Sequence, residues 1–136
     1  MKATVDANIL FSALLKKSLT RRIWFVPEIR LFAPRFLLKE FQKYASYLEN
    51  KYHGNTAEFQ SLCEKLLEQV VFVEDGELKP YLPAAASLSK DPKDWLYLAC
   101  ALKENTIIWS DDKEFKKQAR VETKTTKEMK EEIGML

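Results

Sequence analysis

The feature that most constrains the fold of this 136-residue chain is the alternation of short apolar runs with amphipathic segments. Runs typical of buried strands occupy residues 3–5, 29–33, 70–73 and 106–109, and a weaker one lies near Val121. Between them, apolar residues recur at three- and four-residue spacing, which predicts helices. Strands that alternate with helices favour a parallel sheet covered on both faces. The sequence therefore predicts an α/β fold, a three-layer α/β/α domain with a central parallel sheet.

The predicted helices have recognisable ends. Asn55 and Glu58 resemble a capping pair, and Thr125 with Glu128 forms the pattern of a capping box at the start of the last helix. The sequence Asp75-Gly76 predicts a turn. Besides a helix directly after the first strand, the expected helices cover residues 19–25, 35–52, 56–69, 82–88, 91–103 and about 114–118.

Size and composition indicate one compact domain over residues 1–136, because 46% of the residues are hydrophobic and no linker or repeat interrupts the chain. Cys63 and Cys100 lie in helical patterns, where a thiol behaves as a small hydrophobe. The periodicity also places Trp95 and Trp109 in the core. The first residues lack the apolar core of a secretory signal, and no apolar run is long enough for a membrane span. We therefore expect a cytoplasmic protein.

The residue types present exclude several kinds of site. His53 is the one histidine, so a His-rich zinc site or a Ser-His-Asp triad cannot be built. The three glycines form no phosphate-binding loop of the NTPase type. Any metal ion must therefore be held by oxygen ligands.

The net charge of +2 is too small to indicate a nucleic-acid partner by itself. Lysine and arginine nevertheless gather in two places along the sequence. Such clusters are common on solvated faces, but they can also contact phosphates. The two clusters are Lys16, Lys17, Arg21 and Arg22, and Lys113, Lys116, Lys117 and Arg120.

Acidic residues recur directly after the predicted strands. Asp6 follows the first strand, Asp111 and Asp112 follow residues 106–109, and Asp91 and Asp94 open the helix before that strand. Ligands of open parallel sheets bind beyond the carboxyl ends of the strands, so these acids are candidates for a site. Each also has a structural explanation, because aspartate is favoured at helix N-caps.

Several carboxylates at one edge of a sheet repel one another unless a cation binds between them. Mg²⁺, or the similar Mn²⁺, prefers oxygen ligands and is commonly bound by carboxylates together with substrate phosphate. One or two such ions can activate water and stabilise the leaving oxygen during displacement at phosphorus. The acids therefore point to phosphodiester hydrolysis.

Four segments in this order resemble the motifs of the PIN-domain ribonuclease family, and the resemblance runs from Lys2 to about Thr125. Any one segment is a weak signal, but four in the same order are specific. They are Val5–Leu10 with its D-x-N motif, Pro34–Glu40 with its glutamate, the aspartate-led Asp94–Leu102, and Ser110–Phe115 with its (T/S)-x-D-x-x-F motif.

The resemblance implies a PIN-like, metal-dependent ribonuclease. It assigns catalysis and Mg²⁺ or Mn²⁺ binding to Asp6, Glu40, Asp94 and Asp112. Asp6 and Asp94 are expected to be the main ligands, with Glu40 and Asp112 orienting water or a second ion. The supporting polar groups would be Asn8 and Ser110, and possible contributions of Asp111 and Asp91 are left open, with capping favoured for Asp91.

Substrate contacts are a further expectation. Lys39, Lys113 and Lys116 lie nearest the acids in sequence and are expected to steer RNA phosphates. Single-stranded RNA also stacks on exposed aromatic rings. The sequence does not show which of the three tryptophans is exposed.

Three other interpretations remain beside a processing nuclease. Many small proteins of this family are VapC-type toxins of toxin–antitoxin pairs, which implies an antitoxin partner and a homodimer. The main alternative is a catalytically silent PIN-like module that binds RNA or protein. A phosphate-receiver domain is a third, but it would need a lysine near the acids after its last strands, and the order here fits it worse.

Overall fold

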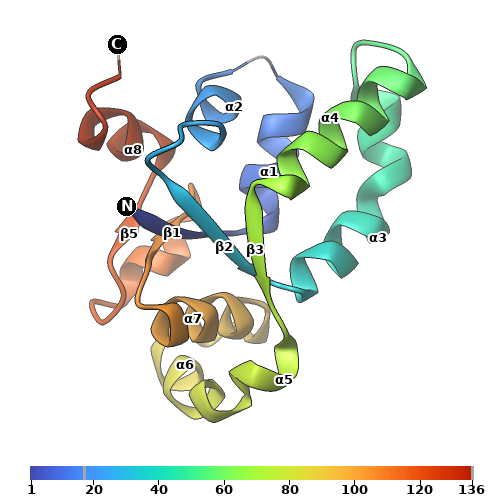
Figure 1. Ribbon diagram of the computed structural model, residues 1–136. Coiled ribbons are helices and arrows are strands. Elements are labelled where there is room, and N and C mark those ends of the chain that lie inside the picture. The colour runs from blue at the N-terminus through green and yellow to red at the C-terminus, as the bar shows by residue number, and fades with distance from the viewer. Residues whose placement is uncertain (17, 136) are drawn as a thin grey trace.

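The computed structural model describes residues 1–16 and 18–135. In this part of the chain a parallel sheet has the strand order β3-β2-β1-β4-β5 (Figure 1). The predicted three-layer α/β/α fold is confirmed. The weak strand expected near Val121 lies two residues further on. The strands are β1 (Lys2–Val5), β2 (Arg30–Pro34), β3 (Val70–Val73), β4 (Ile107–Trp109) and β5 (Thr123–Lys124).

Helices cover both faces of the sheet (Figure 1). On one face lie α1 (Ala7–Leu15), α2 (Leu19–Trp24), α3 (Phe36–Lys51), α4 (Thr56–Glu68) and α8 (Thr126–Glu132). On the other face lie α5 (Asp75–Leu78), α6 (Leu82–Leu88) and α7 (Pro92–Glu104), with the 3-10 turn η1 (Lys79–Tyr81) between α5 and α6. A second 3-10 turn, η2 (Lys113–Lys117), follows β4.

One local prediction was wrong. Asp75 and Gly76 form the first turn of α5 rather than a reverse turn. The reason is a long-range contact, because the Asp75 carboxylate accepts a hydrogen bond of 3.2 Å from the backbone N–H of Phe36 at the start of α3. Sequence spacing alone carries no sign of that contact.

The core is built on the three inner strands β2, β1 and β4, whose residues are mostly buried. Trp109 of β4 is fully buried and stacks at a tilt on Trp24 of α2, with ring centroids 6.1 Å apart. Both indole N–H groups are hydrogen-bonded. Trp24 Nε1 donates to the Leu66 carbonyl at 2.8 Å, and Trp109 Nε1 donates to Thr126 Oγ1 at 3.0 Å. Trp95, which was expected in the core, is only half-buried.

The predicted caps are present. Asn55 Oδ1 accepts from the backbone N–H of Glu58 at 2.8 Å, and Thr125 with Glu128 forms a complete capping box. Cys63 and Cys100 are free thiols and buried, as expected for small apolar residues. Across residues 1–16 and 18–135, we find no helix that is both long and apolar enough to cross a membrane.

Candidate active site

The order of the strands creates a crevice beside β1. The chain passes from β1 to β2 and β3 on one side and then crosses to β4 on the other side of β1. Ligands of such sheets bind where the strand order reverses, at the carboxyl ends. Val5 is paired in register with Trp109 there. Asp6 therefore leaves β1 beside the point where Ser110 leaves β4.

A cavity of about 120 Å³ lies at this point. It brings together four carboxylates and one amide that the sequence had predicted, although they come from distant segments. The predicted residues that line it are Asp6, Asn8, Glu40, Asp94 and Asp112. The other lining residues are Ala7, Asp91, Lys93, Tyr97 and Phe115.

Asp6 is the most enclosed of these acids, with 6% of its surface exposed. Its Oδ1 accepts from the backbone N–H of Ile9 at 3.0 Å, which caps α1, and its Oδ2 accepts from the hydroxyl of Ser110. Burial nevertheless raises the Asp6 pKa to about 6, and the nearby Asp112 and Asp111 add to the rise. Asp6 is thus both a helix cap and a carboxylate whose negative charge is disfavoured by its surroundings.

Asp94, in the first turn of α7, is also buried. Its Oδ2 accepts from Ser89 Oγ at 2.9 Å. Burial raises the pKa of Asp94, and the negative charges of Asp91 and Asp112 raise it further. Asp91 caps α7 as predicted, accepting from the backbone N–H of Lys93 at 3.0 Å, yet it also lines the cavity.

Glu40 reaches the cavity from the second turn of α3. The hydroxyl of Tyr97 donates a hydrogen bond to Glu40 Oε1. Tyr97 is buried, and burial raises the pKa of its hydroxyl well above the usual range, with a further rise from its bond to Glu40. The phenol therefore stays protonated and orients the glutamate.

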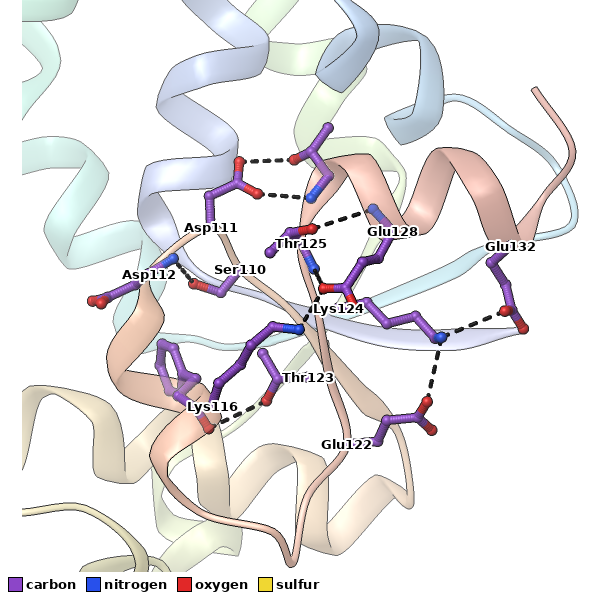
Figure 2. Close-up of polar contacts among 12 residues, drawn as sticks. Ser110, Asp111, Asp112, Lys116, Glu122, Thr123, Lys124, Thr125, Glu128 and Glu132 are labelled. Carbon is purple, nitrogen blue, oxygen red and sulfur yellow. Dashed lines mark hydrogen bonds and ion pairs between the residues drawn. The ribbon is translucent and has the colours of Figure 1, made fainter. Parts of the chain in front are cut away.

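Asp112 is the exposed acid at the mouth of the cavity. Its backbone N–H donates to Ser110 Oγ at 3.0 Å (Figure 2). Its Oδ1 accepts from the backbone N–H of Glu114 at 2.9 Å. Ser110 thus touches both Asp6 and Asp112, which makes it the shared support of the two acids that follow β1 and β4.

The donor set fits a hard divalent cation. Among the described residues, Glu40 Oε2, Asp94 Oδ1 and Asp112 Oδ2 accept no hydrogen bond, so each of these acids keeps one oxygen for a ligand. In that same part of the chain, no group of three or more acidic, His or Cys side chains is close enough together to hold a metal ion by itself. Mg²⁺ commonly keeps several waters and is bound by one or two carboxylates together with substrate phosphate.

Other predicted residues do not line the cavity. Asp111 points to α8, where its two oxygens accept from the backbone N–H and hydroxyl of Thr126 at 2.7 and 2.8 Å (Figure 2). Lys116 is paired with Glu128. Lys39 and Lys113 are exposed and lie outside the lining. Their contact with RNA, and any support from Asp111, stay predictions.

Both basic clusters contain residues that make structural contacts. Arg21 donates to the carbonyls of Ala13 and Leu14 at 2.7 and 3.0 Å, which closes the end of α1. Lys117 pairs with Glu114 at 2.8 Å. Lys17 lies outside the described residues. Contact of the remaining cluster residues with phosphates stays a prediction.

Sequence reasoning missed Lys93 and Tyr97, which also line the cavity. Both are on α7 with Asp94. Tyr97 lies three residues after Asp94, hence on the same helical face, and this spacing was the available signal. Periodicity alone classes such a tyrosine as core.

Comparison with known sequence families shows which family the chain belongs to. A sequence model of the PIN domain matches residues 4–134, almost the whole chain. The chain belongs to the PIN-domain family. A search of curated proteins finds no significant match.

Solved structures agree with the PIN fold. One that matches is a chain from the crystal structure of VapBC2 from Rickettsia felis bound to a DNA fragment from their promoter. It aligns with a TM-score of 0.65 and 18% sequence identity over 92% of this chain and 98% of that one. At this identity the likeness establishes the fold.

Proposed function

We propose that this PIN-domain protein is a Mg²⁺- or Mn²⁺-dependent endoribonuclease. The main support is that Asp6, Glu40, Asp94 and Asp112 line one cavity. These four residues belong to four separate segments, and the cavity lies where the strand order reverses. The family assignment supports a nuclease. The supports given to each acid by Ser110, Tyr97 and Ser89 add to this, because catalytic groups need fixed positions.

A divalent cation bound here would offset the carboxylate charge and supply a Lewis acid for water and phosphate. Asp6 and Asp94, the buried acids, would be the main ligands. Glu40 and Asp112 carry an unpaired oxygen and would orient the attacking water toward phosphorus. Lys93 lines the same cavity and would attract the substrate phosphate.

The test is cleavage of fluorescently labelled single-stranded and structured RNAs in Mg²⁺, Mn²⁺ or EDTA. The proposal expects cleavage with either metal, none in EDTA, and a loss of at least about a hundredfold in Asp6→Asn and Asp94→Asn. Asp75→Asn is the matched control, because Asp75 lies outside the cavity and an amide can still accept from Phe36. Equal activity in all variants would overturn the carboxylate site.

A catalytically silent module that binds RNA or protein is the second candidate. The observation in its favour is that no group of three or more His, Cys, Asp or Glu side chains among the described residues is placed to hold a metal ion. It predicts RNA or protein binding without cleavage in any metal. Wild-type protein that neither cleaves RNA nor binds Mn²⁺ would favour this candidate.

We further propose that the protein acts in the cytoplasm as the toxin of a toxin–antitoxin pair, as a homodimer inhibited by a small antitoxin protein. The support is the fold shared with a chain of VapBC2. Expression should then arrest growth in wild type and not in Asp94→Asn, and co-expression of the adjacent gene should relieve the arrest. Normal growth with an active enzyme would contradict the toxin role.

A further inference from the structure

A second cavity adjoins the acidic one and is several times larger. Its volume is about 710 Å³, within the roughly 300–1,000 Å³ of small-ligand pockets. Asp91 lines both cavities, so they are neighbours. The residues that line this groove are Ala86, Ser87, Leu88, Ser89, Lys90, Asp91, Trp95, Glu114 and Lys117.

Ser89 joins the groove to the acidic cavity. Its hydroxyl donates to Asp94 Oδ2 at 2.9 Å, and its carbonyl accepts from Trp95 Nε1 at 2.8 Å. The same residue therefore fixes the Asp94 carboxylate and the edge of the Trp95 ring. A group seated beside Trp95 would lie next to the phosphate-cleaving acids.

The chemistry of the groove suits a flat, polar ring better than a phosphate. Leu88 and Trp95 offer apolar surface. The Ser87 hydroxyl donates to the Ala84 carbonyl at 2.6 Å and can still accept a hydrogen bond from a ligand. Asp91 and Glu114 would repel a phosphate placed inside, because Lys117 is already paired with Glu114 at 2.8 Å.

Lys90 can contact the phosphate backbone of an RNA strand that crosses the groove. It is exposed, and we find no ion pair for it with any described residue. From this position it can attract the backbone of a strand whose base occupies the groove.

We propose that this groove binds a nucleobase of single-stranded RNA, next to the phosphate that is cleaved, by stacking on Trp95. The inference rests on the proposed ribonuclease function and names how its substrate is held. Base–aromatic stacking is sequence-tolerant, so the groove would select for an unpaired base rather than for one sequence.

Tryptophan fluorescence tests the groove without any cleavage. Trp24 and Trp109 are 1% and 0% exposed, so a base in solution can stack on Trp95 alone among the three indoles. A mixed-sequence hexaribonucleotide in EDTA should quench the emission of wild type and of Asp6→Asn. It should not quench Trp95→Phe, and an abasic hexamer should not quench wild type.

Cleavage kinetics of Trp95 variants then show whether stacking on Trp95 contributes to binding of the RNA substrate. Trp95→Phe keeps an aromatic face and should retain activity within about threefold, whereas Trp95→Ala should raise KM about tenfold or more, as expected for one lost stacked base. Tyr47→Ala is the matched control, because Tyr47 is an aromatic residue of α3 outside the groove and 58% exposed. It should behave like wild type.

The outcomes separate this proposal from the function on which it rests. Trp95-dependent quenching without cleavage in any metal would overturn the nuclease function and still support the groove. Absence of quenching in wild type, equal quenching in Trp95→Phe, or an unchanged KM in a folded Trp95→Ala would overturn the groove even if cleavage is present. Thermal unfolding of Trp95→Ala checks that it is folded.

Discussion

At the scale of single residues, the acids of the cavity carry a cost in the metal-free protein. Asp6 and Asp94 are buried, and burial raises the pKa of both. A raised pKa means that the charged form is less stable in the folded chain than in the unfolded chain. The negative charges of these two residues therefore lower the stability of the fold when no cation is bound.

Asp6→Asn should therefore stabilise the protein without metal at neutral pH. The Asp6 pKa rises from 3.8 to about 6 on folding, so ionisation destabilises the fold increasingly as the pH rises from about 4 to 6 and fully above 6. Asparagine cannot ionise but can still cap α1. Thermal unfolding in EDTA should show a gain of on the order of 2–3 kcal/mol at pH 7.5, which vanishes near pH 4. An equal gain at both values would contradict it.

Tyr97→Phe tests a positioning residue. The change removes only the hydroxyl that donates to Glu40. Loss of a hydrogen bond to a charged group should lower kcat about tenfold, with KM within about twofold, because the glutamate loses orientation and not substrate contact. Tyr47→Phe, an exposed hydroxyl deletion elsewhere on α3, should leave both constants unchanged. A matching rise of KM would instead indicate a binding role.

At the scale of elements, the ends of β1 and β4 decide where the acids lie, and helix caps decide how they point. The caps at Asp6, Asp91 and Asp112 were predicted from sequence, and all are present. The same side chains line the cavity, so a capping residue can also be part of the proposed site. By contrast, the start of α5 contacts α3 through the hydrogen bond between Asp75 and Phe36, and local patterns do not contain such a contact between distant segments.

The start of α8 is a second test of cap energetics. Thr125 Oγ1 accepts from the backbone N–H of Glu128 at 3.2 Å, within a complete capping box. Thr125→Ala should lower the free energy of unfolding by about 1 kcal/mol and speed amide exchange in the first turn of α8. Thr56→Ala, at the exposed first helical position of α4, is the control. Unchanged exchange in α8 would contradict the role of the cap.

At the scale of the whole molecule, the alternation of strands and helices was enough to predict the layers, but not the strand order. Placing β4 beside β1 is what brings Asp6 and Ser110 together. The sequence predicted that Asp6 and Ser110 lie together only through its resemblance to PIN-domain motifs. The Trp95 groove could not be predicted, because periodicity treats a half-buried tryptophan as core.

The central claim is that four distant carboxylates bind one metal centre, and Mn²⁺ titration followed by electron paramagnetic resonance tests it most directly. We expect saturable binding in wild type and a loss of affinity of at least about tenfold in each of Asp6→Asn, Glu40→Gln, Asp94→Asn and Asp112→Asn, with Asp75→Asn unchanged. Wild-type affinity in any one of the four variants would remove that residue from the centre. No saturable binding in wild type would contradict the claim itself.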